Sequence, residues 1–344
     1  MYVQSSPKSL FEKKRIMITG GTGSLGKALS KKLLTFDVET IVIFSRNENA
    51  QVMMEREFND PRLRFFIGDV RDKERLLRAI EGVQIVFHAA ALKHVPVIEY
   101  NPFEAIKTNV IGSQNIIDVC HTEKVEIAIG IGTDKAASPL NTYGATKLLM
   151  ERLFVTASNY VNKIKHPTKF IALRYGNVLG SSGSVVPTFL EQIASKGKIT
   201  ITDPNMTRFS INMDEALDFI FNSVQHCKGS ETFVPKIKSY NIMDLKDALF
   251  DLVGKAEVEV TSARPGEKIS EVLIGKEEMR NAIENGYEYV LPKPELTENE
   301  VTQLYPNHKR VKEIFEYSSD KAERMSKEEL KKCLIDAGLA KKVL

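Results

Sequence analysis

The stretch TGGTGSLG, residues 19–26, decides the fold of this chain. It follows the short apolar run RIMIT (15–19), which has the pattern of a β-strand, and it opens SLGKALSKKLLTF (24–36), which has the pattern of a helix. Glycine permits a tight turn and lets backbone amides approach a pyrophosphate, which then lies at the N-terminus of the helix. A glycine loop between a strand and a helix therefore predicts a dinucleotide site with contacts from Gly20, Thr22, Gly23, Ser24, Leu25 and Gly26.

The segments after this loop continue the alternation of strand and helix. The pattern predicts further strands at 40–45, 63–69, 83–90, 125–132 and 170–176, and further helices at 72–82, 102–123 and 142–161. Nearly continuous apolar strands separated by helices are typical of a parallel sheet that is covered on both faces. We therefore predict an α/β fold, a Rossmann-type doubly wound parallel sheet.

The regular alternation ends after Tyr175, where stretches rich in glycine and proline interleave with helices. We predict a Rossmann domain over 1–175 and a smaller C-terminal substrate-binding lobe over 176–294, interleaved with the first domain. A polar extension over 295–344 is predicted to end in an amphipathic helix. The apolar residues on one side of that helix are Leu330, Cys333, Leu334 and Leu339.

Composition and charge exclude several classes of protein. A hydrophobic content of 42% in 344 residues supports a large core, and a net charge of +3 gives no argument for nucleic-acid binding. The three cysteines are far apart and form no CxxC motif, so they indicate reduced thiols rather than a metal site. No signal peptide is visible, and no apolar run approaches the roughly 20 residues of a membrane-spanning helix. We expect a cytoplasmic protein that does not insert into membranes.

The end of the second strand, FSRNE, indicates which dinucleotide binds. Folds that select NAD usually carry an acidic residue there, whereas an arginine accommodates the additional phosphate of NADP. Ser45 and Arg46 occupy this place, so the sequence predicts NADP in preference to NAD. Further cofactor contacts are predicted from residues at the ends of the next strands: Asp69, for the adenine amino group, with Val70, and the small residues Ala89 and Ala90, which core packing would explain equally well.

A second motif, TDKAASPLNTYGATK (133–147), contains candidate catalytic residues. Tyr143 and Lys147 are four residues apart at the start of a predicted helix, so both project from one face. A lysine beside a phenol favours the phenolate and can bind the nicotinamide ribose, which makes Tyr143 a usable base. Thr133 can donate a hydrogen bond to the same substrate oxygen.

Together these motifs resemble the extended short-chain dehydrogenase/reductase family. The stretches FSRNE, HAAALKHVPVIEYNPFEAIKTNV, TDKAASPLNTYGATK, LRYGNVLGSSGSVVP, MTRF and RPGEK are similar to nucleotide-sugar 4,6-dehydratases, in particular to the branch that inverts carbon 5 of UDP-N-acetylglucosamine. The resemblance implies that Lys135 removes the carbon-5 proton and that Asp134 is the acid for water loss. Retaining relatives use an Asp-Glu pair instead. No metal is implied.

The same resemblance implies a set of substrate contacts. Sugar and nucleotide contacts are implied for Lys93 with His94, Asn177, Arg208, Arg264 and Glu267, and a supporting role for Asn109. Each charged residue among them would also fit an ordinary surface charge. Two positions depart from the family pattern on the substrate side: Ser182 replaces an arginine in GSSGS, and Ser270 replaces a histidine after GEK.

Two other functions remain open from the sequence. A UDP-sugar 4-epimerase shares the fold and the cofactor loop but does not need Asp134 or Lys135. A non-catalytic NADP-binding regulator is possible on the same scaffold, because a fold does not fix a function. In the family the helices at 102–123 and 142–161 form a four-helix interface, so the resemblance also implies a homo-oligomer, a dimer or larger.

Overall fold

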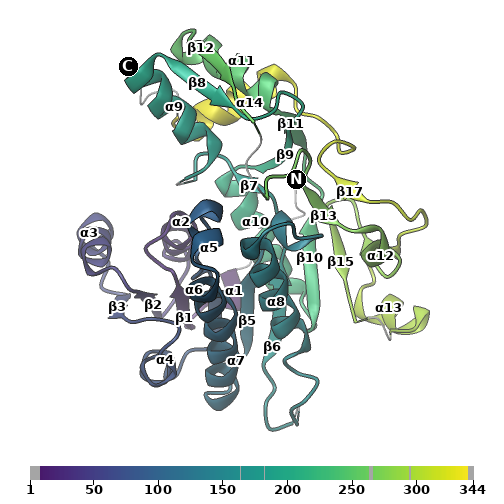
Figure 1. The fold of residues 1–344 in the computed structure, drawn as a ribbon. Coiled ribbons are helices and arrows are strands. Elements are labelled where there is room, and N and C mark those ends of the chain that lie inside the picture. Colours follow the sequence, from purple (N-terminus) through teal and green to yellow (C-terminus); the bar gives the residue numbers. More distant parts are fainter. Residues whose placement is uncertain (1–7, 163, 182, 263–265, 294–295, 340–344) are drawn as a thin grey trace.

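A ten-stranded sheet forms the centre of the molecule (Figure 1). The structure, a computed structural model, describes residues 8–162, 164–181, 183–262, 266–293 and 296–339. Seven neighbouring strands are parallel, in the spatial order β3 (Leu63–Ile67), β2 (Thr40–Ser45), β1 (Arg15–Thr19), β4 (Ile85–His88), β5 (Ile127–Ile131), β6 (Lys169–Leu173) and β10 (Glu231–Pro235). The predicted Rossmann-type sheet is confirmed.

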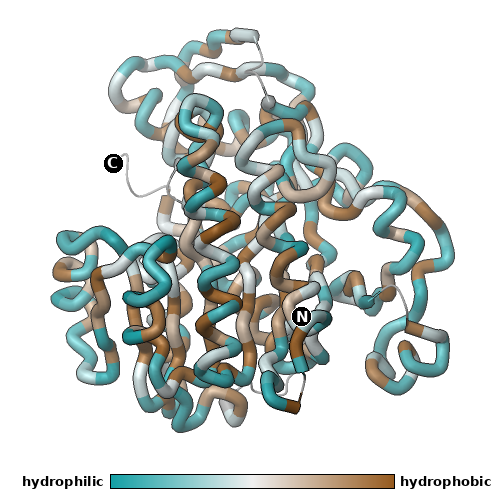
Figure 2. The backbone as a smooth tube through the Cα atoms, turned by 60° about the horizontal axis from the view of Figure 1, so that its bottom comes forward, coloured by the Kyte–Doolittle hydropathy of each residue, from teal (hydrophilic) through white to brown (hydrophobic). Residues whose placement is uncertain are grey.

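Helices cover both faces of this sheet, and alternate side chains of each strand enter two separate cores. One core contains Ile16 and Ile18 of β1 with Leu29 and Leu33 of α2 (Ser24–Leu33), and α10 (Met213–His226) packs there as well. The other core contains Met17 and the inner faces of α4 (Lys73–Ile80), α7 (Gly112–Thr122) and α8 (Thr142–Thr156). Figure 2 shows apolar stretches along these strands and helices, with hydrophilic residues on many connecting turns.

Two helical details differ from the sequence pattern. The helix predicted over 102–123 consists of α6 (Pro102–Ala105), a π-helical segment (Ile106–Ile111) and α7, and it follows α5 (Val95–Tyr100). The sequence analysis also missed α3 (Glu48–Phe58), which lies between β2 and β3. Only two of its residues, Gln51 and Met54, are buried, so its apolar pattern is weak.

A smaller group of elements lies beyond the carboxyl ends of the parallel strands (Figure 1). β7 (Asn177–Val178), β9 (Thr207–Ile211) and β11 (Ser239–Asn241) form one small sheet. β8 (Lys198–Ile201) pairs with β12 (Glu257–Val260), and β13 (Val272–Ile274) pairs with β17 (Tyr317–Ser318). The helices of this part are α9 (Val185–Lys196), α11 (Ile242–Val253), α12 (Lys276–Met279) and α14 (Lys327–Asp336).

The chain after residue 176 also returns to the main sheet. β10 extends the parallel strands, and three antiparallel strands complete that edge: β15 (Glu288–Leu291), β14 (Ile283–Glu284) and β16 (Lys309–Arg310). α13 (Glu298–Leu304) lies between β15 and β16 in the sequence, and α14 packs against α11 with Leu330, Leu334 and Leu339 buried. The predicted divisions at 175 and 294 stay a prediction.

A buried arginine connects the sheet to the C-terminal elements. Arg174, just after β6, is fully buried and donates to both carboxylate oxygens of Glu151 on α8, at 2.5 and 3.1 Å. It also donates to both carboxylate oxygens of Glu278 on α12, at 2.8 and 2.9 Å, and to the carbonyl of Leu273. Burial alone would lower the pKa of this guanidinium, but the two carboxylates outweigh that effect and raise it. The arginine therefore stays charged and fixes α12 against the core.

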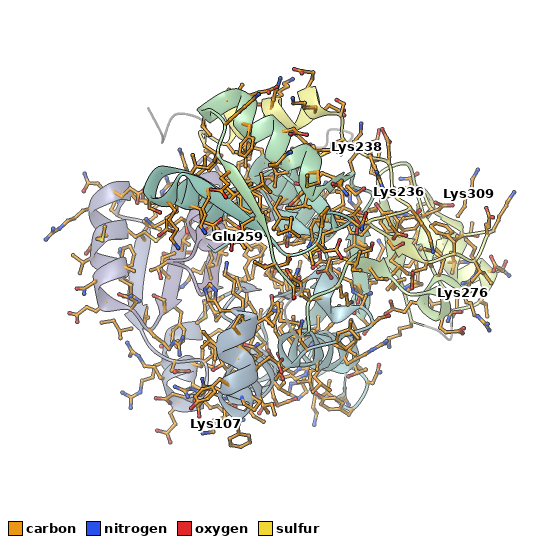
Figure 3. All side chains as sticks on the ribbon, turned by 45° about the horizontal axis from the view of Figure 1, so that its top comes forward. Lys107, Lys236, Lys238, Glu259, Lys276 and Lys309 are labelled. Atoms are coloured by element: carbon orange, nitrogen blue, oxygen red, sulfur yellow. The ribbon has the colours of Figure 1, made fainter. Side chains whose placement is uncertain are left out.

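The outer surface is rich in charged side chains, several of which project at the periphery, such as Lys107, Lys276 and Lys309 (Figure 3). Cys120 and Cys227 are buried free thiols, and Cys333 is a partly buried one. Among the described residues, no group of histidine, cysteine, aspartate and glutamate side chains has the arrangement of a metal site. Within that same part of the chain, every helix is too short or too polar to span a bilayer.

Candidate active site

The loop between β1 and α2 can be formed only with glycine at key positions. Gly20 has φ +68°, and a Cβ atom there would lie 2.9 Å from backbone atoms of Ala90. A Cβ at Gly26 would lie 2.4 Å from the carbonyl oxygen of Gly21. The first contact brings the loop against the end of β4, and the second brings α2 against the loop. Amides at the start of α2 are thereby left facing open space.

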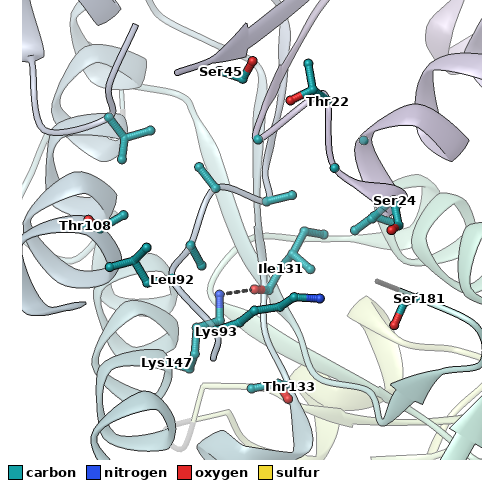
Figure 4. Close-up of a pocket in the computed structure, with 18 of the residues that line it drawn as sticks. Thr22, Ser24, Ser45, Leu92, Lys93, Thr108, Ile131, Thr133, Lys147 and Ser181 are labelled. Carbon is teal, nitrogen blue, oxygen red and sulfur yellow. Dashed lines mark hydrogen bonds between the residues drawn. The ribbon is translucent and has the colours of Figure 1, made fainter. Parts of the chain in front are cut away.

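That space is a cavity of about 510 Å³, within the usual size range for small-ligand sites. Its walls include the ends of β1, β2, β4 and β5, the start of α8 and the loop after β7 (Figure 4). The structure brings most of the predicted site residues together here. Those that line the cavity are Gly20, Thr22, Gly23, Ser24, Leu25, Gly26, Ser45, Arg46, Asp69, Val70, Ala89, Ala90, Lys93, Thr133, Tyr143, Lys147 and Asn177.

The remaining predicted residues lie elsewhere. Asp134 and Lys135 follow Thr133 directly in a 3₁₀ turn, behind the cavity wall rather than in it. Arg208 and Glu267 lie together in the C-terminal part, with 3.9 Å between the Arg208 guanidinium and the Glu267 carboxylate. Arg264 and Ser182 lie outside the described residues.

Charged groups surround Asp69 at the β2–β3 end of the cavity. Arg71 donates two side-chain hydrogen bonds to one Asp69 oxygen, at 2.7 and 3.0 Å, and the Arg46 guanidinium lies 3.9 Å from the same oxygen. Burial would raise the pKa of Asp69, but these arginines outweigh it and lower the pKa. Asp69 is therefore an ionised acceptor, and Arg46, about half exposed, is accessible to a ligand at the cavity rim.

A buried histidine relay supports the floor of the cavity. His88 Nδ1 lies 2.8 Å from the Thr19 hydroxyl, and His88 Nε2 lies 3.0 Å from the Ser113 hydroxyl, which itself donates to the carbonyl of Asn109. Ser113 must therefore accept from Nε2, so Thr19 donates to Nδ1. Burial and the nearby Lys147 lower the pKa of His88 to about 3, so the ring is neutral. The sequence analysis did not identify this relay.

Asn109 fixes the segment that carries Lys93. Its amide accepts from the Leu92 N–H at 2.8 Å and donates to the Leu92 carbonyl at 3.0 Å and to the Thr146 hydroxyl at 2.9 Å. Asn109 lies in the π-helical segment, a local feature often found at functional sites. The resemblance implied a supporting role for Asn109, and in the structure its side chain joins the β4–α5 loop to α8.

Lys147 and Tyr143 project from the first turns of α8, which Asn141 caps by accepting from the Gly144 N–H. The buried Lys147 donates to the Ile131 carbonyl at 2.5 Å, as Figure 4 shows, and burial lowers its pKa to about 8, although Glu151 opposes the shift. Burial raises the pKa of Tyr143 overall, although the charge of Lys135 and a hydrogen bond with Thr133 act to lower it. The lysine charge that acts on the phenol here is that of Lys135, whereas the sequence pattern predicts this effect from Lys147.

Asp134, the partly buried Lys135 and a second carboxylate that was not predicted, Glu271, form an ionic cluster. Asp134 is fully buried, and its Oδ1 accepts from Thr133 at 2.9 Å and from the Lys135 ammonium at 3.0 Å. Lys135 Nζ also lies 3.4 Å from the Asn177 side-chain oxygen and 3.6 Å from Glu271. Burial alone would lower the pKa of Lys135, but Asp134 and Glu271 raise it overall.

Glu271 lies four residues after Glu267 and is 3% exposed. Its backbone N–H donates to the Ser319 hydroxyl, and its carbonyl accepts from the Ser319 N–H. Arg208 and Lys268 each lie 4.0 Å from its carboxylate. Ser270, one of the two departures from the family pattern, accepts from the Thr207 hydroxyl at 3.1 Å and is not part of the cavity wall. The sequence offered one signal for Glu271: it is a carboxylate four residues after Glu267, a predicted contact of the nucleotide sugar.

Comparison with known proteins assigns the chain to a family. A family model described as "Polysaccharide biosynthesis protein" matches residues 16–293. The chain belongs to this family.

Relatives of the chain carry different names. The inverting UDP-N-acetylglucosamine 4,6-dehydratase of Campylobacter jejuni is 43% identical over 318 residues, which cover 90% of this chain and 94% of that protein. The UDP-glucose 4-epimerase of Rickettsia felis is 39% identical over 332 residues, which cover 95% and 97%. The X-ray structure of Pen from Bacillus thuringiensis is 36% identical with a TM-score of 0.88, covering 96% of this chain and 99% of that chain. The resemblance seen in the motifs is thereby confirmed.

Proposed function

We propose that this protein is an NADP-dependent UDP-N-acetylglucosamine 4,6-dehydratase that inverts carbon 5. The observation that carries the proposal is the hydrogen-bonded pair of Asp134 and Lys135, directly behind Thr133 and Tyr143. A dehydratase needs two proton-transfer groups in addition to the base for the 4-hydroxyl. The 43% identity to the named dehydratase supports the same assignment. The product would be a 4-keto-6-deoxy sugar nucleotide for surface polysaccharide or glycan synthesis.

The cavity fits a dinucleotide. Gly20 lets the loop pack against Ala90, residues Gly23 to Gly26 at the start of α2 line the cavity, and the amides of this turn suit a pyrophosphate. Arg46 and Ser45 at the end of β2 suit a 2′-phosphate, and Lys147 suits the nicotinamide ribose. A nicotinamide held beside Tyr143 and Lys147 would supply a hydride acceptor for carbon 4 and a hydride donor for carbon 6, with no net consumption of the cofactor.

The residues of this chain perform the proton transfers. Tyr143 takes the proton of the 4-hydroxyl, while Thr133 donates to the same oxygen. The 4-ketone formed on the sugar acidifies carbon 5, and Lys135 removes that proton. Asp134 protonates the hydroxyl that leaves carbon 6 as water. Asn177, Arg208, Arg264 and Glu267 are the proposed contacts of the nucleotide sugar.

The ionisation of the resting pair does not match these roles until one proton moves. Asp134 and Glu271 keep Lys135 protonated in the structure, whereas a base must be neutral. The hydrogen bond of 3.0 Å between Lys135 Nζ and Asp134 Oδ1 offers a direct route. Transfer of one proton breaks an N–H bond, forms an O–H bond and leaves the net charge unchanged. It produces a neutral amine and a carboxylic acid, the two forms that the reaction requires.

A UDP-sugar 4-epimerase is the second candidate, because a relative of 39% identity carries that name. An epimerase returns hydride to carbon 4 and needs only Tyr143, Thr133 and Lys147. A non-catalytic regulator is a third possibility, and it would be unaffected by Tyr143→Phe, whereas either enzyme would lose turnover.

The deciding experiment is incubation of the purified protein with UDP-N-acetylglucosamine in heavy water. We expect loss of one water, and deuterium at carbon 5 with the coupling of the inverted sugar in the NMR spectrum. A new 4-epimer of unchanged carbon skeleton and no water loss would establish the epimerase instead. Unchanged substrate would contradict both assignments for this sugar and would direct attention to Ser270 and Ser182.

The cofactor preference has its own test. Arg46→Ala removes the guanidinium that we expect to contact the 2′-phosphate, and a charge-assisted contact of this kind is worth about 1.5–3 kcal/mol. NADP affinity should fall roughly tenfold or more, by the conversion of about 1.4 kcal/mol per tenfold, with NAD affinity little changed. Fluorescence titration of both dinucleotides measures this. Equal losses for the two would argue against a 2′-phosphate contact.

We also propose a homo-oligomer. Several large apolar side chains on α5, α6, the π segment and α8 are exposed, including Tyr100 at 88%, Phe103 at 63% and Leu149 at 50%. These helices lie side by side on one face of the sheet (Figure 1). Clustered apolar side chains on a surface usually mark an interface. Light scattering should give a mass of at least two chains, and Phe103→Glu should reduce it.

A further inference from the structure

Inversion at carbon 5 needs two proton-carrying groups. The group that removes the proton acts on one face of the sugar, and the new proton must arrive from the other face. The proposed function, on which the following rests, assigns only the removal, to Lys135. The new proton therefore needs a second donor on the opposite side of the sugar.

Lys93 meets the geometric requirement. It lines the cavity from the loop between β4 and α5, and Figure 4 shows its side chain extending across the cavity towards Ser181. Its neighbour Leu92 is held by both backbone hydrogen bonds to Asn109, so the base of the side chain is fixed. Lys135 belongs to the segment after β5, and its ammonium is held towards the C-terminal part by Asn177 and Glu271. The two lysines therefore belong to different segments: Lys93 lines the cavity, and Lys135 contacts Asn177, a residue of the cavity wall.

The environments of the two lysines shift their pKa values in opposite directions, as the two roles require. Two carboxylates raise the pKa of Lys135, which makes its amine the stronger base once it is neutral. Burial lowers the pKa of Lys93, which makes its ammonium a better proton donor than a surface lysine. Environments that separate the pKa values of similar groups are typical of acid and base partners in one site.

The other candidates in or near the cavity have different contacts. Lys147 donates to the Ile131 carbonyl. Lys268 donates to the Ala137 carbonyl, lies 4.0 Å from the Glu271 carboxylate and is not part of the cavity wall. The ring of His94 packs against the loop after β7, where a Cβ at Gly183 would lie 2.7 Å from its Cε1. Lys93, in contrast, lines the cavity itself, and its side chain extends across it (Figure 4).

We propose that Lys93 is the catalytic acid that delivers the new proton to carbon 5 from the face opposite Lys135. After reduction at carbon 6, the electron pair at carbon 5 is conjugated with the 4-ketone. One N–H bond of the Lys93 ammonium breaks, and one C–H bond forms at carbon 5. The neutral amine regains its proton from water, which reaches the side chain through the open cavity.

Lys93→Gln and Lys93→Arg test the proposal together. Arginine keeps the positive charge and the length, so it should rescue a role in binding or packing, but it is too weak an acid to replace a proton donor. We expect both variants to bind UDP-N-acetylglucosamine within about threefold of wild type and to lose roughly a hundredfold or more in kcat, the lower end of the range for a general acid. Without the proton at carbon 5 the reduction at carbon 6 should reverse, so both variants should accumulate the dehydrated, unreduced 4-ketone, detected by mass spectrometry in a single turnover.

The outcomes separate this proposal from the proposed function. A wild-type protein that dehydrates the substrate, with a Lys93→Gln variant that forms the inverted product at an unchanged rate, would overturn only the role of Lys93. Full rescue by arginine would overturn it as well, and so would a stall in His94→Gln combined with normal turnover in Lys93→Gln. A wild-type protein that exchanges no carbon-5 proton and loses no water would overturn both proposals.

Discussion

Lys147 is a buried amine whose ionisation couples activity to stability. The side chain is 4% exposed, and its pKa in the folded chain is about 8 against 10.5 for the free group. The unfolded chain therefore binds this proton more tightly, so burying the charged form opposes folding. The cost is fully present below pH 8 and disappears as the pH rises towards 10.5, because neither state is then charged.

Lys147→Met should consequently show a pH-dependent difference in the free energy of unfolding. The shift of about 2.5 pH units corresponds to about 3 kcal/mol. The difference in unfolding free energy between variant and wild type should therefore favour the variant by most of that amount more at pH 7 than at pH 10. The lost hydrogen bond to Ile131 affects both pH values alike and cancels. Urea denaturation at the two pH values measures the difference, and turnover should be abolished. Lys107→Met, at an exposed site, is the control and should show a constant difference.

Residues of the glycine loop and the Thr133–Lys147 motif could be predicted because local spacing fixes their chemistry. Gly20 needs no distant partner to be recognised, and Tyr143 and Lys147 share a helix face by their spacing alone. Glu271 was missed because its value depends on Lys135, and only the tertiary fold brings these two segments together. The sequence pattern assigned the electrostatic effect on Tyr143 to Lys147, whereas in the structure Lys135 exerts it. This difference has the same cause.

At the scale of elements, the helix between α5 and β5 illustrates what a pattern can miss. The apolar periodicity over 102–123 predicts one continuous helix, and the chain is helical throughout, but a π-helical segment at Ile106–Ile111 inserts extra residues into the turn. Side chains before and after the insertion face different directions from those of a regular helix. This change directs Asn109 to Leu92 and Thr146, contacts that no single-sequence period encodes.

Asn109→Ala should therefore damage the site through the β4–α5 loop. It removes the side-chain partner of the Leu92 N–H and carbonyl, at a cost of about 1–3 kcal/mol, and frees the segment that carries Lys93. We expect lower thermal stability and at least a tenfold loss of kcat. Asn101→Ala, which removes one exposed hydrogen bond to Val97 on the adjacent turn, is the matched control. A variant as stable and as active as that control would contradict the role given to Asn109.

At the scale of the molecule, the end of the described chain returns to the site. The terminal helix was predicted from its apolar side, but its partner was not, because an amphipathic pattern does not name the surface that it covers. In the structure α14 packs on α11, and Leu339 lies against Gly180 in the loop after β7. A Cβ at Gly180, which has φ +74°, would lie 2.8 Å from a methyl group of Leu339. The next residue of that loop, Ser181, lines the cavity.

Leu339 should therefore position the substrate loop in addition to filling a core. Leu339→Ala and Leu334→Ala remove the same atoms from one hydrophobic cluster, and each should cost about 2–5 kcal/mol of unfolding free energy. The nearest side chain to Gly180 is that of Leu339, so we expect Leu339→Ala, and not Leu334→Ala, to raise the KM for the UDP-sugar several-fold at unchanged kcat. Steady-state kinetics below the melting temperature of both variants separate the two effects. Equal KM values would mean that the cluster stabilises the fold without setting the loop, since a general loosening would affect both variants alike.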